Sequence, residues 1–428
     1  MFPETPRDAV ERQYEAAQSA FAALGIDADR AIAKAVAAPL SLHAWQGDDV
    51  AGLEVKDSGG VASGGLLATG NYMGRARSGD EIRADAEKVL SLAPGKHRFN
   101  IHAMYAEAGR PVDRDKLEPK HFAKWIAWAK RLGLGLDFNP TYFSHPKAAD
   151  GATLTHRDAA IREFWVRHGI ASRRIAEAIA RELGTPSVNN HWIPDGMKDS
   201  PADRWGPRER LAESLDAILA KSVGVDPKLC VDAVEGKLFG LGSEDYVPGS
   251  NDFYAAYALK RGVVLTLDMG HFHPTESVAD KLSALLQFHK RLLVHVSRPI
   301  RWDSDHVVIF NDDLRAVFQE LVRGGALDRV YLALDYFDAS INRIAAWTIG
   351  ARSVRKAILA ALLEPVELLK KLEAEGKGGQ KLAVMEDLKT LPFAAVWNML
   401  CLRHGAPAGM AWLNEIEAYE REVLSRRV

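Results

Sequence analysis

Cysteine is scarce in this sequence. Only Cys230 and Cys401 occur among its 428 residues. Two cysteines supply neither a disulfide framework nor a zinc site built on thiolates. So few cysteines are typical of a protein that works in a reducing compartment.

Long apolar runs and an excess of one charge are missing as well. No apolar run approaches the roughly 18 residues that a membrane helix needs. The first residues, MFPETPRDAVERQYEAAQ, carry charges throughout and lack the apolar core of a signal peptide. The net charge of −2 gives no electrostatic attraction to nucleic acid or to an anionic membrane. We therefore expect a soluble cytoplasmic protein with no nucleic-acid or membrane partner.

What the chain does contain is a regular alternation of two kinds of segment. Amphipathic stretches, such as 80–93, 121–133, 157–184 and 207–221, predict helices. Between such stretches lie short, nearly continuous apolar runs that predict strands of a parallel sheet. These runs are 41–45, 98–103, 134–139, 187–192, 230–235, 263–268, 292–296 and 330–335. Eight such units, with no G-x-G-x-x-G after any strand, favour an α/β protein with a (β/α)₈ TIM barrel over an open dinucleotide-binding sheet.

Three regions fall outside the eight units. Residues 1–40 predict one or two N-terminal helices that lead into the first strand, and 353–428 predict a helical extension. We therefore divide the chain into a catalytic barrel domain, 1–352, and a C-terminal helical extension, 353–428, that contacts either the barrel or another subunit. The Gly-rich segment 46–79 has no clear period, and a long segment of this kind is typical of a lid or a binding loop.

Polar residues stand at or near the end of every predicted strand. They are His43, His102, Asp137, His191 with Trp192, Glu235, Asp268, His295 and Asp335. The carboxyl ends of barrel strands meet on one face, where the active site lies, so these side chains are expected to converge. A single such residue is more often a helix cap, but four consecutive strands that end in Glu, Asp, His and Asp favour a metal site. Three carboxylates and one imidazole suit Mn²⁺ or Mg²⁺ better than zinc.

A second metal site is suggested by the segment SRPIRWDSDHVV. Asp303 and Asp305 are two residues apart on a predicted loop, where both carboxylates can reach one ion together with His271. The alternative is a helix-capping pair with solvated charge. Two adjacent divalent ions can hold neighbouring oxygens of a substrate and ionise a bound water.

Three further residue types near the strand ends have two interpretations each. Lys237 either polarises a substrate oxygen or simply pairs with Glu235. Trp192 and Trp302 either stack on a sugar or fill the barrel mouth. His273, followed by proline, is expected to fix its loop and not to bind metal.

Long stretches of the chain resemble bacterial L-rhamnose isomerase. They are SLHAWQGDDV, HWIPDGMKD, DAVEGKLFGLG, LDMGHFHPTE, HVSRPIRWDSDHVV, LDYFDASINRIAAW and LPFAAVWNML, which together span nearly the whole sequence. The resemblance implies a metal-dependent aldose–ketose isomerase on a (β/α)₈ barrel, related to xylose isomerase and usually a homotetramer. It implies two divalent ions per subunit, which we expect to be Mn²⁺, with Mg²⁺, Co²⁺ or Zn²⁺ as substitutes.

The resemblance also implies a role for each site residue. Glu235, Asp268, His295 and Asp335 would hold a structural metal, and His271, Asp303 and Asp305, with Asp268 shared, a catalytic metal. Lys237 would contact the substrate oxygen, and His102 would assist opening of the sugar ring. Trp192 and Phe337 would line the sugar site. Met104, with Leu53, Leu66 and Leu67, is a candidate for contact with the sugar methyl group.

The resemblance favours a hydride shift from C2 to C1 over proton transfer through an enediol, between which the residues themselves do not decide. Two other classes of protein remain open. A metal-dependent hydrolase, an endonuclease included, would need three clustered metals and a basic cleft, which the net charge of −2 disfavours. A non-catalytic sugar-binding protein would have no use for the second metal site.

Overall fold

The computed structural model describes residues 1–54, 70–237, 244–273, 275–300 and 303–427, without the side chains of 303–305. Eight parallel strands close into a barrel in the order β1-β10-β7-β6-β5-β4-β3-β2. They are β1 (Leu40–His43), β2 (His97–His102), β3 (Gly135–Asn139), β4 (Ser187–Trp192), β5 (Cys230–Glu235), β6 (Val264–Asp268), β7 (Leu292–Val296) and β10 (Val330–Leu334). The predicted TIM barrel is confirmed, and the ends of each predicted strand lie within two residues of the observed ends.

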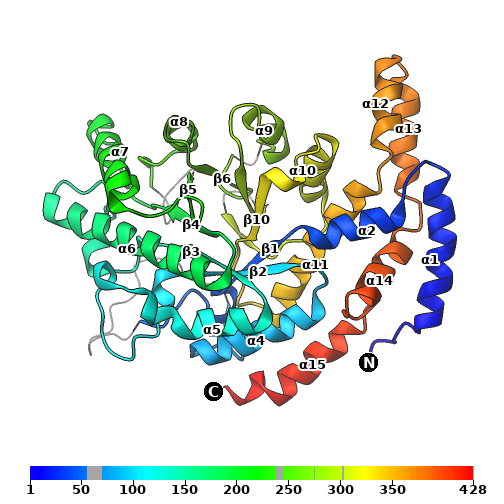
Figure 1. The fold of residues 1–428 in the computed structure, drawn as a ribbon, viewed down its shortest axis with the longest axis horizontal. Coiled ribbons are helices and arrows are strands. Elements are labelled where there is room, and N and C mark those ends of the chain that lie inside the picture. Colours follow the sequence, from blue (N-terminus) through cyan, green and yellow to red (C-terminus); the bar gives the residue numbers. More distant parts are fainter. Residues whose placement is uncertain (55–69, 238–243, 274, 301–302, 428) are drawn as a thin grey trace.

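A helix follows each barrel strand and covers the outside of the sheet (Figure 1). These helices are α4 (Gly79–Leu92), α5 (Ala123–Leu132), α6 (Ala159–Leu183), α7 (Trp205–Leu219), α8 (Asn251–Arg261), α9 (Val278–Leu285), α10 (Asp312–Arg323) and α11 (Arg343–Leu362). Their ends follow from local sequence: Asp158 caps α6 by accepting from Ala160 N, and Gly184 ends it in the left-handed conformation that glycine adopts without strain. A short α3 (Trp45–Asp48) follows β1, and β8 (Arg298–Ile300) and β9 (Asp303–His306) form a hairpin after β7.

The two faces of the barrel sheet carry different side chains. Outward residues of the strands, such as Leu42, Phe99, Leu136, Leu267 and Val294, are buried and belong to the large apolar core under the helices. The inward face has only a small apolar cluster, made of Val188, Ala233, Leu293 and Ala333. The partly buried Val231, Val264 and Tyr331 pack against this cluster. Many of the remaining inward residues are polar, among them Ser41, Asn100, Asn139, Asn190 and Thr266.

The remaining helices come from the two ends of the chain. They are α1 (Arg7–Ala22), α2 (Ala28–Ala37), α12 (Val366–Ala374), α13 (Gly378–Leu388), α14 (Phe393–Arg403) and α15 (Trp412–Glu422). The first helix packs against α14, while α12 and α13 stand out from the body (Figure 1). The division expected after residue 352 falls inside α11, so the barrel and the C-terminal region share a continuous helix. Among the described helices, none has the length and apolar character to cross a membrane.

Candidate metal centre

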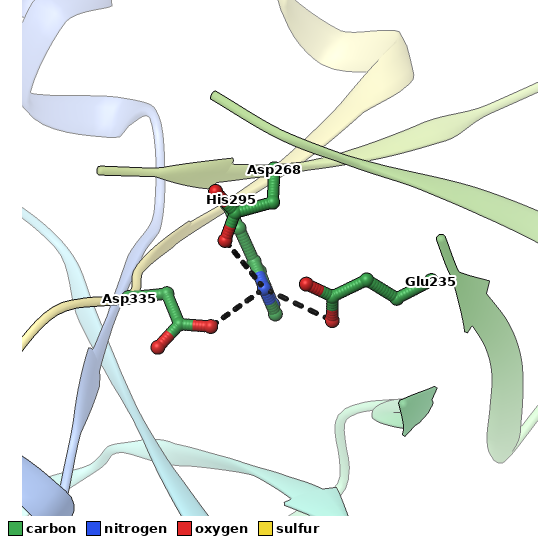
Figure 2. Close-up of side chains that lie close together, drawn as sticks. All are labelled: Glu235, Asp268, His295 and Asp335. Atoms are coloured by element: carbon green, nitrogen blue, oxygen red, sulfur yellow. Dashed lines mark ion pairs between the residues drawn. The ribbon is translucent and has the colours of Figure 1, made fainter. Parts of the chain in front are cut away.

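Four residues from neighbouring strands meet at the carboxyl-terminal mouth of the barrel. Glu235 and Asp268 end β5 and β6, His295 lies in β7, and Asp335 follows β10. One potential ligand atom from each lies within 4.8 Å of the others, and the side chains point toward one another (Figure 2). The parallel register that pairs Asp268 with His295 brings these residues to the same level of the barrel.

His295 Nδ1 is the centre of this group. It lies 3.0 Å from Asp335 Oδ2, 3.3 Å from Glu235 Oε2 and 3.7 Å from Asp268 Oδ2. His271 adds a second imidazole, with its Nδ1 3.0 Å from Glu235 Oε1. Three carboxylates and two imidazoles are therefore close together, and all but Asp335, whose side chain is 23% exposed, are buried.

The electrostatics of the group follow from burial and crowding. Burial raises the pKa of Asp268 to about 6, with the neighbouring imidazoles acting against the rise and the other carboxylates adding to it. Burial disfavours the charged forms of His295 and His271 too, yet the carboxylates around them raise the pKa of both imidazoles. In the same way, burial acts against the charge of Glu235, but the two imidazoles lower its pKa. The site thus holds excess negative charge that a cation would balance.

The donor set fits a divalent metal ion. Asp268 Oδ2 has no hydrogen-bond partner among the described residues and faces both imidazoles at 3.7 and 3.9 Å. A buried carboxylate oxygen without a hydrogen bond is costly unless an ion binds it. Carboxylate oxygens with imidazole nitrogen form a mostly hard site, which suits Mn²⁺ or Mg²⁺.

One oxygen of each carboxylate is held by a hydrogen bond from the protein. Trp45 Nε1 donates to Asp335 Oδ1 at 2.9 Å, Asn190 Nδ2 donates to Glu235 Oε2 at 2.6 Å, and Ser297 Oγ donates to Asp268 Oδ1 at 2.7 Å. Sequence reasoning missed these three supporting residues. Two of them, Trp45 and Asn190, lie in predicted strands. A polar group on the inward side of a strand that neighbours a candidate ligand is the sequence feature that could have revealed them. Such partners orient metal ligands and tune their affinity.

A pocket opens beside the carboxylates. Aromatic and polar side chains line it, among them Trp45, His102, Phe143, Trp192, Lys237, His271 and Phe337. Lys237 Nζ lies 5.3 Å from the ring centroid of Trp192, a cation–π contact. Burial lowers the pKa of His102 to about 4, so its imidazole is neutral at physiological pH. An apolar wall with a few convergent polar groups is typical of a small-molecule site.

The sequence comparisons agree with this arrangement. A family model described as L-rhamnose isomerase matches residues 8–427. The chain is 54% identical over 419 residues to the L-rhamnose isomerase of Mannheimia succiniciproducens, and 53% identical over 418 residues to that of Salmonella typhimurium. Each alignment covers 98% of this chain and 99% of the relative. The chain belongs to the L-rhamnose isomerase family.

Among solved structures, similarity is lower. A D-psicose 3-epimerase from Clostridium cellulolyticum H10 aligns with a TM-score of 0.44 and 13% identity, over 76% of this chain and 96% of that one. The barrel assignment for this L-rhamnose isomerase family member therefore rests on its own strand order.

Several other residues expected from the family resemblance can be located. His102, Trp192, Lys237, His271 and Phe337 all line the pocket. Met104 is buried beneath the chain that follows α3, where its carbonyl accepts from Leu53 N at 2.8 Å. His273 Nδ1 lies 2.7 Å from Thr275 Oγ1 within its own turn.

Of the expected second metal site, the side chains of His271 and Asp268 are described, whereas Asp303 and Asp305 are described only in their backbone. Asp303 and Asp305 belong to strand β9 of the β8–β9 hairpin, and not to the loop that the sequence predicted. Their side chains, and the residues Trp302, Leu66 and Leu67, lie outside the described part of the structure.

Three other residues predicted to converge at the strand ends do not join the group of Glu235, Asp268, His295 and Asp335. Asp137 faces the opposite mouth of the barrel, where it accepts from Arg98 Nε and Nη2 at 2.9 and 2.8 Å. His191 joins a buried network with Tyr142 and Asp232. His43 packs edge-on against Tyr336 and Trp347. His191 is on the outward face because a strand places alternate side chains on opposite faces. Asp137 points inward but lies one level deeper in the barrel, beside Asn100 and not at the strand end.

Proposed function

We propose that this protein interconverts L-rhamnose and L-rhamnulose as a divalent-metal-dependent isomerase. The observation that carries the proposal is the group of Glu235, Asp268, His295 and Asp335, which lies beside a pocket lined by aromatic rings in a chain of this family. A hydrolase or a non-catalytic sugar-binding protein finds no support in the family match.

We propose metal-binding residues in addition to Glu235, Asp268, His295 and Asp335. We propose that a second ion binds through His271, Asp303 and Asp305 with Asp268 shared, and that Mn²⁺ is the preferred ion, with Mg²⁺, Co²⁺ or Zn²⁺ as substitutes. Divalent ions bound there would act as Lewis acids that polarise the carbonyl and hydroxyl oxygens of the sugar.

The side chains of the pocket would position the open-chain sugar. Trp192 and Phe337 line the pocket and would contact the carbon chain, and Lys237 beside Trp192 would donate to an oxygen on the reacting carbons. His102 is fixed by contacts of its two ring nitrogens with Thr141 Oγ1 at 3.3 Å and Asn139 Nδ2 at 3.2 Å. By giving up its contact with Asn139, this neutral imidazole would hydrogen-bond to the ring oxygen through Nε2 as the sugar opens.

We favour hydride transfer for the isomerisation. The hydrogen on C2 moves with its electron pair to the carbonyl carbon C1, while the O2 proton passes to O1, which converts the aldose into the ketose. Among the described side chains that line the pocket, the carboxylates are Glu235 and Asp335, and both belong to the metal group. Proton abstraction through an enediol would require a carboxylate base that is free of that group.

The family resemblance also leads us to propose a homotetramer that works in the cytoplasm. Light scattering of the purified protein tests the tetramer, because a monomer or dimer at micromolar concentration would contradict it.

NMR of L-rhamnose with metal-stripped protein in D₂O, before and after addition of Mn²⁺, tests the proposed function. We expect L-rhamnulose only with metal and without deuterium at C1. Deuterium at C1 would replace the hydride shift by the enediol route. Absence of product with every divalent ion would reject the isomerase.

A further inference from the structure

The inside of the barrel below the metal centre is unusually polar. In most TIM barrels the inward side chains are branched aliphatic residues stacked in layers. Here Ser41, Asn100, Asp137, Asn139 and Asn190 point inward, and all of them are buried. Amides and carboxylates pack less well than aliphatic groups and need hydrogen-bond partners. This half of the barrel is therefore built to hold something polar.

A cavity of ≈ 190 Å³ runs along these residues. Its outer end lies at the amino-terminal mouth of the barrel, where Pro39 and Pro186 are exposed. Its inner end is His295, which is only 1% exposed. Asn139 lines both this cavity and the pocket on the opposite side, so it forms part of the wall between them.

Three buried polar atoms on the cavity wall have no hydrogen-bond partner among the described residues. They are Asn100 Oδ1, Asn139 Oδ1 and His295 Nε2, on residues that are 3%, 3% and 1% exposed. Leaving such an atom without a partner costs about 1–3 kcal/mol. A polar cavity of adequate size next to several such atoms is the setting in which proteins hold ordered water.

We propose that this cavity is a hydration channel that supports His295 from behind. The cavity is large enough to hold several waters. These waters would enter from the amino-terminal mouth and donate to the oxygens of Asn100 and Asn139. One would accept the N–H of His295 Nε2.

The channel matters to the metal centre because of the orientation of the His295 ring. Nδ1 faces the three carboxylates, so a neutral ring that binds metal through Nδ1 carries its proton on Nε2. Metal-binding histidines almost always donate this second N–H to a carboxylate, a carbonyl or a water, which fixes the ring. Since the described residues offer no such acceptor, water in the channel fills this role. This step rests on the proposed metal-binding role of His295.

The floor of the channel is braced by an ion pair. Arg98 donates to both oxygens of Asp137 and also to the carbonyl of Pro186 at 2.6 Å. Ser41 Oγ donates to Asp137 Oδ2 at 2.8 Å. Because Arg98 and Asp137 pair with each other, neither charge is available to select an ion, and water is the ligand that the amides of the channel suit.

A high-resolution crystal structure of the metal-free protein is the first test, and it does not depend on activity. We expect ordered waters within hydrogen-bond distance of Asn100 Oδ1, Asn139 Oδ1 and His295 Nε2. A cavity closed by side chains, or one that binds xenon under pressure as a dry apolar cavity does, would overturn the proposal. If the channel held waters but the protein lacked isomerase activity, the proposed function would be rejected and the hydration channel would stand.

Calorimetric titration with Mn²⁺ tests the support of His295. Asn100→Leu keeps the size of a channel residue but removes its polar atoms, and we expect the Kd for Mn²⁺ to rise about 10-fold, as in other losses of outer-shell support. Leu293→Met, on the apolar side of the same channel, is the matched control and should leave the Kd unchanged. An unchanged Kd in a folded Asn100→Leu protein, or equal effects of the two variants, would overturn the positioning role.

Discussion

The two faces of the same eight strands differ in what they contribute to the molecule. Outward side chains such as Phe99, Leu136 and Leu267 are apolar and pack under the helices. Inward side chains are mostly polar, and at the carboxyl-terminal end they form the candidate metal centre. The apolar packing that stabilises the fold thus lies mainly between sheet and helices, whereas the inward side chains along the barrel axis mainly form the candidate site. A change on one face should leave the property carried by the other face nearly intact.

The largest effect is expected from Asp268→Asn at the metal centre. Loss of this carboxylate should reduce the rate of L-rhamnulose formation by about 1,000-fold, a loss at the upper end for a single electrostatic contact in an active site. The unfolding temperature of the metal-free protein should stay the same or rise, because burial and the neighbouring carboxylates disfavour the charge of Asp268.

Asp216→Asn is the matched control, since Asp216 pairs with Arg261 on the outer surface. It should retain full activity. If the unfolding temperature of metal-free Asp268→Asn were several degrees lower than that of the parent protein, the inward residues would contribute to stability, and the contrast between the two faces would fail.

The next effect concerns the outer face. Phe99 packs against Trp125, Trp128 and Trp347, so Phe99→Ala should lower the free energy of unfolding by about 4 kcal/mol. The rate per folded molecule should change little. Urea unfolding measures the first quantity, and turnover at low temperature measures the second.

The adjacent inward residue provides the contrast. Asn100→Ala should cost about 1 kcal/mol or less, because water can fill the space left in a polar cavity. Equal costs for the two substitutions would mean that the inner face is packed as tightly as the outer one.

This contrast also explains which features of the fold and the candidate site could be predicted from the sequence. The β-branched and apolar runs predicted all eight barrel strands, since a parallel sheet covered by helices requires them. The ends of these strands predicted the grouping of Glu235, Asp268, His295 and Asp335. Asp137 was misplaced because its position in the strand, one level deeper in the barrel, depends on the register between strands. Trp45 and Asn190 were missed because contacts between side chains of different strands are set by barrel closure.

A buried carboxylate away from the axis gives a smaller effect that depends on pH. Burial raises the pKa of Asp48 to about 7, against hydrogen bonds from Tyr105 Oη at 2.7 Å and Gly52 N at 2.8 Å. In the unfolded chain this pKa is about 3.9. The folded state therefore binds the proton more tightly, and its stability falls as the pH rises from roughly 4 through 7.

Between pH 5.5 and pH 8.5, this group alone should cost the metal-free protein about 2 kcal/mol of stability. Asp48→Asn should remove the loss, because the amide can accept from Gly52 N and donate to the Tyr105 oxygen, as the protonated acid does. Urea midpoints at the two pH values test this. A variant as sensitive to pH as the parent protein would show that Asp48 is ionised in the folded state.

The smallest effect separates two tryptophans that make the same hydrogen bond on opposite faces. Trp45 Nε1 donates to the candidate ligand Asp335, and Trp128 Nε1 donates to Glu87 on helix α4, each at 2.9 Å. Trp45→Phe should raise the Kd for Mn²⁺ about 10-fold in calorimetric titration, because Asp335 loses the group that orients it. Trp128→Phe should leave the Kd unchanged, since its hydrogen bond lies outside the barrel. Equal Kd values for the two variants would mean that the barrel holds Asp335 in place without Trp45. The inward hydrogen bond would then matter no more for metal binding than the outward one.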